Sequence, residues 1–116
     1  MIIPGIPAVV ESARKRPISF NPATGTYILY DDIASGSLKI VPLEKLSDNE
    51  LISLSVERHL TDDPGTAIVL TGQAFTKKQL ADEIMNQTTI GKQMFEIDIE
   101  YLRFYLSQFP KECFEK

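Results

Sequence analysis

His59 is the only histidine in this 116-residue sequence, so any acid–base chemistry through an imidazole must use it. Glu57 and Asp62 lie close by, but residues two and three positions away do not automatically share a helical face. No serine or cysteine stands in a nucleophile motif such as GxSxG. A surface or helix-end histidine, stabilised by the helix dipole when charged, is therefore our preferred interpretation, ahead of a catalytic one.

Asp98 is the second residue that suggests a site. A long helix predicted over Thr89–Phe109 places it between two apolar stripes, with Tyr101 about one turn away and Tyr105 about two turns away. Because a buried carboxylate needs hydrogen bonds or an opposite charge, Asp98 should either border a groove or meet a donor such as Arg58 or a tyrosine hydroxyl. A small enzyme that uses Asp98 or the lone histidine is our third functional hypothesis.

Metal, phosphate and thiol chemistry have weaker support. The acidic pairs Asp31–Asp32, Asp62–Asp63 and Asp82–Glu83 fall in expected turns or on a helix surface, without the alternating oxygen ligands of a calcium loop. The segment Thr89–Lys92 lacks the first glycine and the final Ser or Thr of a phosphate-binding loop. Cys113 is the only cysteine, which excludes an intramolecular disulfide and a cysteine-based zinc site. We expect no metal, no cofactor and no catalytic set.

Arg14, Lys15 and Arg16 form the only basic cluster, a weak basic patch that could contact phosphate or an acidic partner. A solvated turn before Pro17 is the simpler interpretation. The net charge of −4 argues against broad contact with nucleic acid or anionic membranes, since both need a concentrated positive surface.

The segment Thr76–Gly91 resembles the helix-turn-helix of small bacterial repressors, in which a Leu-Ala such as Leu80-Ala81 precedes a Thr-Ile such as Thr89-Ile90. The resemblance implies a nucleic-acid-associated regulator, our second functional hypothesis. The usual glycine of the turn is absent. The charged residues on the would-be recognition helix are mainly acidic: Glu96, Asp98 and Glu100 against Lys92 and Arg103. Phosphate contact requires the reverse balance, so nucleic acid is a disfavoured partner.

The elements that must position these residues centre on the predicted long helix. One apolar stripe contains Ile90, Met94, Ile97, Tyr101 and Phe104. The other contains Phe95, Ile99, Leu102, Leu106 and Phe109. Together they span an arc of about 200°, wider than a surface helix needs to cover one core. We therefore expect one side of the helix to meet its own domain and the other side to meet something else.

The second stripe, with Asp98 at its boundary, is the candidate interaction surface predicted from the sequence. It comprises Phe95, Asp98, Ile99, Leu102, Leu106 and Phe109. Either the apolar N-terminal arm, residues 1–16, or another molecule should cover it. The leading functional hypothesis is a small non-enzymatic module that binds a protein partner or itself, as a homodimer.

Length and pattern predict one α+β domain, with a small, mostly antiparallel sheet of about four short strands and three helices, the C-terminal helix longest. After the arm, residues 17–42 read as a three-stranded β-meander, residues 47–109 as a helix, a strand and a helix pair, and residues 110–116 as a frayed tail.

Local signals predict where several elements begin. Ser47 and Glu50 have capping-box spacing, which predicts a helix over Asp48–Leu60, although Ile52–Val56 also alternates like a strand. After a turn at Asp62–Gly65, the apolar run Ala67–Leu70 reads as a central strand that joins the sheet. A second capping box, Thr76 with Gln79, predicts a helix that ends near 86–87.

The chain shows no run near the roughly 18 apolar residues of a membrane span. Its N-terminal basic residues follow the apolar segment, whereas those of a secretory signal precede it. We therefore expect a cytoplasmic protein without a membrane partner.

Overall fold

The computed structural model describes residues 4–61, 67–70 and 72–115. The fold is α+β, as the sequence predicts. Within these ranges it contains four α-helices, one more than predicted, and two separate two-stranded hairpins in place of one sheet. The helices are α1 (Tyr30–Ala34), α2 (Asp48–Leu60), α3 (Lys77–Asn86) and α4 (Thr89–Leu106). The strands are β1 (Ser19–Asn21), β2 (Thr26–Ile28), β3 (Ala67–Leu70) and β4 (Gln73–Thr76). Three short 3₁₀ turns are η1 (Glu11–Ala13), η2 (Leu43–Lys45) and η3 (Lys111–Cys113).

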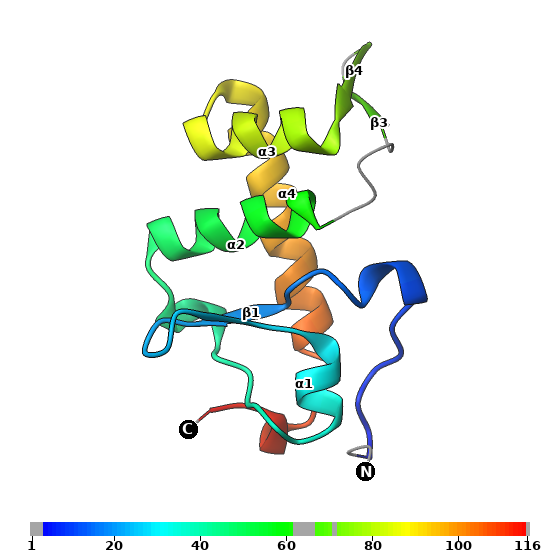
Figure 1. Ribbon diagram of the computed structural model, residues 1–116, viewed down its shortest axis with the longest axis vertical. Helices are drawn as coiled ribbons and strands as arrows, with labels where there is room; N and C mark the ends of the chain where they lie inside the picture. The colour runs from blue at the N-terminus through cyan, green and yellow to red at the C-terminus, as the bar shows by residue number, and fades with distance from the viewer. Residues whose placement is uncertain (1–3, 62–66, 71, 116) are drawn as a thin grey trace.

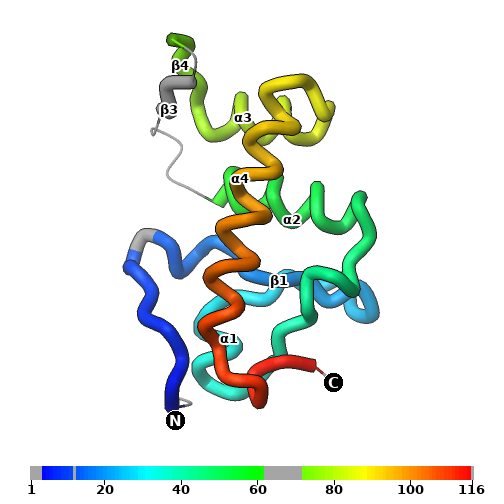
Figure 2. The backbone as a smooth tube through the Cα atoms, turned by 180° about the vertical axis from the view of Figure 1, so that it is seen from behind, coloured from blue at the N-terminus to red at the C-terminus, as the bar shows by residue number. Residues whose placement is uncertain are grey.

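The longest of these helices, α4, runs along the long axis of the molecule, and α2 and α3 cross one half of it (Figures 1 and 2). Thr88 caps its start, since the Thr88 hydroxyl accepts a hydrogen bond from the Gly91 amide at 3.0 Å. The helix ends at Leu106, three residues before the predicted end at Phe109. In both views the first half of α4 lies beside α3, and the second half lies over the N-terminal part of the chain.

The two predicted capping boxes are confirmed. The Glu50 amide donates to the Ser47 hydroxyl at 3.2 Å, and the Gln79 amide donates to the Thr76 hydroxyl at 3.1 Å. The segment Ile52–Val56 is helical, because it continues the helix that Ser47 starts. Its apolar side chains face two clusters: Leu54 lies in the main core, and Ile52 and Val56 pack with Ala81 and Ile84.

The predicted β-meander is only partly correct. The hairpin β1–β2 is present, with Ser19 opposite Ile28. The second strand ends at Ile28, two residues early, because the Asp32 carboxylate accepts a hydrogen bond from the Leu29 amide at 3.0 Å and caps the start of α1. The expected third strand is reduced to one isolated bridge, in which Ile40 pairs with Phe114.

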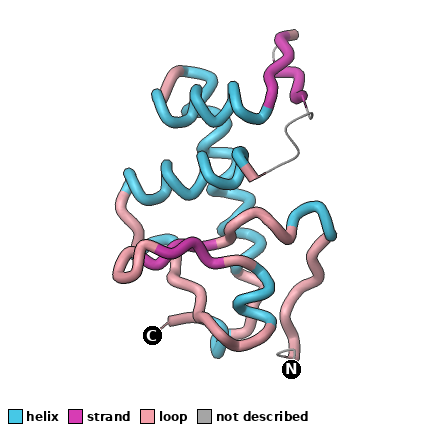
Figure 3. Tube along the Cα trace, in the orientation of Figure 1, coloured by secondary structure: helices cyan, strands magenta, loops and turns pink. Residues whose placement is uncertain are grey.

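The strand β3 lies where it was predicted, but it does not join the first sheet. It pairs with β4, with Ala67 opposite Thr76, and this second hairpin stands at the far end of the molecule from β1–β2 (Figure 3). Gly72, with φ of 84°, supplies the left-handed conformation that lets the chain reverse between the two strands. The predicted turn at residues 62–65 lies outside the described residues.

The N-terminal arm lies on its own core. Tyr30 donates a hydrogen bond to the Pro7 carbonyl at 2.8 Å, and Tyr105 donates to the Ala8 carbonyl at 3.2 Å. Ile6 and Val9 pack against the main core cluster. The arm thus packs in cis, on the core of its own chain.

The C-terminal segment, predicted to be frayed, is instead held in place. The Ile40 amide donates to the Cys113 carbonyl at 2.7 Å, and the Glu115 amide donates to the Ile40 carbonyl at 2.8 Å. Cys113 is fully buried in the main core. The backbone groups of Ile40 need partners in this buried position, and the C-terminal segment supplies them.

Candidate functional site

The structure places the predicted interaction surface mostly inside the molecule. Four of its six members, Ile99, Leu102, Leu106 and Phe109, are at most 5% exposed. They belong to one core cluster with residues of the β1–β2 hairpin, α1 and the segment around η2. Phe95 is half-buried against the same cluster. Its own chain therefore covers most of this stripe.

The exposed apolar residues of α4 belong to the first stripe. Ile97, Tyr101 and Phe104 are 59%, 54% and 68% exposed. Their spacings of four and three residues align them along the helix, and we call these three residues the exposed stripe. The sequence identified both stripes. In the structure the stripe predicted as the interaction surface is largely covered by its own chain, and the other stripe is exposed.

Asp98 meets both of its expected surroundings, because it forms an ion pair with Arg58 and borders a pocket. Arg58 Nε lies 2.9 Å from Asp98 Oδ1, and the two side chains are 6% and 11% exposed. The same guanidinium donates through Nη1 to the Pro17 carbonyl at 2.8 Å. Arg58 therefore ties α2 to α4 and to the segment that leads into β1.

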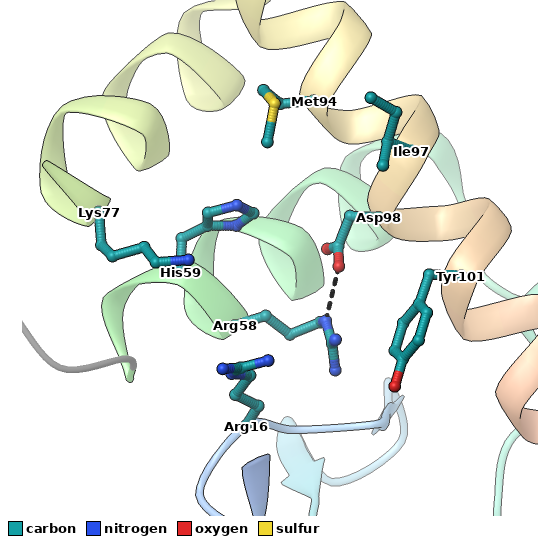
Figure 4. Close-up of a pocket in the computed structure, with 8 residues that line it drawn as sticks. All are labelled: Arg16, Arg58, His59, Lys77, Met94, Ile97, Asp98 and Tyr101. Carbon is teal, nitrogen blue, oxygen red and sulfur yellow. Dashed lines mark hydrogen bonds and ion pairs between the residues drawn. The ribbon is translucent and has the colours of Figure 1, made fainter. Parts of the chain in front are cut away.

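The pocket beside Asp98 has a volume of about 290 Å³ and lies where α2, α3 and α4 converge (Figure 4). Its lining residues are Arg16, Arg58, His59, Lys77, Met94, Ile97, Asp98 and Tyr101. Met94, Ile97, Asp98 and Tyr101 form an α4 wall of apolar groups and one carboxylate. Among the described lining residues Arg16, Arg58 and Lys77 are cationic and Asp98 is the one carboxylate. We call this cavity the basic pocket.

His59 occupies the last turn of α2, as the helix-end interpretation requires, but it is only 7% exposed. Its Nδ1 atom lies 2.9 Å from the Ser55 carbonyl oxygen. Since a carbonyl oxygen can only accept, Nδ1 carries the proton in this contact. Nε2 is then the nitrogen left to accept a hydrogen bond, or to donate one when the ring is charged.

A second cavity of about 120 Å³ adjoins the basic pocket and shares Arg16, Arg58 and Tyr101 with it. Residues of the N-terminal arm and Tyr105 complete its lining. The two cavities follow one another along α4 between Met94 and Tyr105, about 16 Å at the helical rise. We call the two cavities together the α4 groove.

Aromatic rings form part of the groove wall. The rings of Tyr101 and Tyr105 stack at 6.1 Å with an interplanar angle of 3°, and the Arg58 guanidinium lies 6.0 Å from the centre of the Tyr101 ring. Burial, with nearby Tyr30 and Tyr101, raises the pKa of Tyr105 to about 12. Its hydroxyl therefore keeps its proton at neutral pH and holds the arm through the bond to Ala8.

No family model matches this sequence, and comparisons with curated proteins and with solved structures find no match either.

The weak basic patch does not act as one surface. Arg14 lies 3.5 Å from Glu11 and 3.8 Å from Asp31, and its guanidinium faces the Tyr30 ring at 5.9 Å. Arg16 instead lines both cavities of the groove. Arg16 is therefore the residue of this cluster that lines the groove, together with residues that are distant in sequence.

The sequence alone did not bring Lys77, Met94 and Ile97 together at one site. The stripe pattern marked Met94 and Ile97 as apolar, and the capping box placed Lys77 at the first position of α3. Within the described residues no cluster of three or more His, Cys, Asp or Glu side chains is arranged to hold a metal ion. Of the helices in the described ranges, none combines the length and hydropathy needed to cross a bilayer.

Proposed function

We propose that this protein is a non-enzymatic interaction module that binds a segment of another protein in the α4 groove. One observation carries the proposal: the exposed stripe of α4 stands directly beside the basic pocket, and Ile97 and Tyr101 belong to both. Contiguous large apolar side chains on a protein surface are typical of binding sites, and tyrosine is enriched among the residues that dominate binding energy.

Charge indicates what the partner segment contains. The whole chain carries a net charge of −4, whereas cations outnumber carboxylates among the described residues of the basic pocket. Apolar side chains of the partner segment complement Ile97, Tyr101 and Phe104, and acidic side chains of the same segment can meet the arginine and lysine side chains of the lining. An amphipathic, acidic segment that lies along α4 satisfies both conditions.

A small enzyme is the second candidate function, because His59 and Asp98 line the same pocket. Acid–base chemistry would use His59 Nε2, since Asp98 is engaged with Arg58. Among the described residues of the lining, none is a serine, threonine or cysteine that could act as a nucleophile. Binding is therefore the function that this geometry supports best.

Selection from a displayed library of random peptides of about 16 residues tests the proposal. A helix of that length is about 24 Å long and is therefore long enough to span the groove. Selected peptides should combine acidic and apolar residues. Ile97→Glu should weaken their binding at least about tenfold. Met85→Glu is the matched control, because Met85 is also 59% exposed but lies on α3 outside the groove. The proposal would be overturned if the selected peptides bound both variants equally, or if the selection gave no peptide whose binding depends on Ile97.

Light scattering on the same variants tests whether a second copy of this chain fills the groove. A monomer of wild-type protein supports binding of a different protein. A dimer that Ile97→Glu dissociates and Met85→Glu preserves would overturn the proposal in favour of self-association.

A further inference from the structure

Two acceptor atoms in the basic pocket receive no hydrogen bond from the described residues that line it. Asp98 Oδ2 is buried and has no partner, although Oδ1 of the same carboxylate is bound to Arg58. His59 bonds to the Ser55 carbonyl through Nδ1, so the neutral ring keeps its lone pair on Nε2. In Figure 4 this ring forms no bond with any other residue of the lining.

The two acceptors belong to side chains that are almost completely buried and that come from different walls. His59 is 7% exposed and the Asp98 side chain 11%. The first ends α2, the second lies in the middle of α4, and the pocket separates them (Figure 4). A buried acceptor without a donor is unfavourable, because it has lost its water and gained no bond. A ligand that brings donors into this space removes that cost.

The ion pair decides the charge of such a ligand. Arg58 already balances Asp98 at 2.9 Å and is held in place by the Pro17 carbonyl, so a cationic ligand would have to compete with Arg58. A neutral donor meets Oδ2 and leaves the pair intact. A hydroxyl group has one hydrogen to donate, whereas an amino or primary amide group has two, one for each acceptor.

The remaining lining suits a flat apolar body. Met94 and Ile97 present a thioether and an aliphatic side chain, and Tyr101 presents an aromatic ring. Met94 is also flexible and can shift to admit a ligand to the buried Oδ2 atom. A volume of about 290 Å³ is at the small end for ligand sites and fits a single substituted ring.

We infer that the basic pocket binds a small aromatic amide or amine, which donates its N–H bonds to His59 Nε2 and Asp98 Oδ2 and lays its ring against Met94 and Tyr101. The inference goes beyond the proposed function and does not depend on it. A partner segment needs the exposed stripe of α4, whereas this ligand needs the two buried acceptors.

Benzamide and acetophenone test the inference, because they share a ring and a carbonyl group and differ only where a methyl group replaces the amino group. NMR titration of the wild-type protein at about pH 8, where a free imidazole is neutral, gives both dissociation constants. Benzamide should bind at least about fivefold more tightly and should shift the ring resonances of His59. Equal affinities, or no binding of either compound, would overturn the inference.

Removal of each acceptor shows where the preference for benzamide comes from. His59→Phe keeps a ring without Nε2, and Arg58→Met with Asp98→Leu removes the carboxylate together with its counter-charge. The preference should fall at least about twofold in each case. Met85→Glu, on α3 outside the pocket, is the matched control and should retain it. An undiminished preference in either acceptor variant, once folded, would overturn the inference. The proposed function fails separately, when no selected peptide depends on Ile97.

Discussion

Arg58 Nε and Asp98 Oδ1 lie 2.9 Å apart, and this contact joins the last turn of α2 to the middle of α4 beneath the candidate groove. Both side chains are almost completely removed from water, and the guanidinium has a second acceptor in the Pro17 carbonyl. The groove therefore rests on an ion pair whose two members depend on one another.

Asp98→Ala should destabilise the protein by about 3–5 kcal/mol, because it leaves the buried Arg58 without its counter-charge. Urea unfolding measures the change. Replacing both partners, as Arg58→Met with Asp98→Leu, should recover most of the loss, since no buried charge remains. Asp82→Ala, at an exposed acid on α3, serves as the control. A loss below about 1 kcal/mol for Asp98→Ala would show that the pair is solvated.

Gly91→Ala should separate α3 from α4. A Cβ atom at this position would overlap the backbone carbonyl of Glu83, so the two helix backbones must move apart. Overpacking of this kind costs about 1–3 kcal/mol or more. Thermal unfolding should show the loss, and Gln93→Ala, at an exposed position on the same helix, should show little change. Equal stability of the two variants would contradict the close approach.

Tyr105 should ionise late in an alkaline titration. Burial raises its pKa from 10.0 to about 12, so between these values the folded protein holds a proton that the unfolded chain has released. Its contribution to stability is therefore complete below about pH 10 and is lost as the pH rises towards 12. Tyrosinate absorbance measures the ionisation, and Tyr105→Phe should remove the step near pH 12. Retention of that step in the variant would assign it to another tyrosine.

Cys113 should react slowly with a chromogenic disulfide reagent in the folded protein. Its side chain is fully buried, and burial together with the neighbouring Glu112 raises the pKa of the thiol. Reaction then requires opening of the C-terminal segment, so the rate should rise by at least about 100-fold in urea. Equal rates in native and unfolded protein would mean that the contacts to Ile40 do not persist in solution.

The sequence predicted the helices well because their start signals are local. Ser47, Thr76 and Thr88 each accept a hydrogen bond within three residues, so neither the signal nor its effect depends on the rest of the fold. The sequence does not predict the start of α1, because the β-branched and aromatic residues up to Tyr30 are typical of a strand. The carboxylate of Asp32, which caps the helix and so ends the strand, has the sequence pattern of a turn.

The choice between the two stripes of α4 could not be made from periodicity. The pattern shows which residues share a face, but Leu102 and Phe104 are both apolar, and only the tertiary packing decides that the first is buried and the second 68% exposed. The basic pocket was hidden for a similar reason. Arg16, His59 and Lys77 come from three elements whose crossing is set by long-range contacts.

The bonds between Ile40 and the segment around Cys113 also bear on how this protein is made. A ribosome releases the chain from its N-terminus, so Ile40 emerges well before the residues that satisfy its backbone groups. The core around Ile40 and Cys113 is complete only when residues 113–115 are outside the ribosome. A product that stops short of them would keep an open core, and quality-control proteases could distinguish it from a chain that includes them.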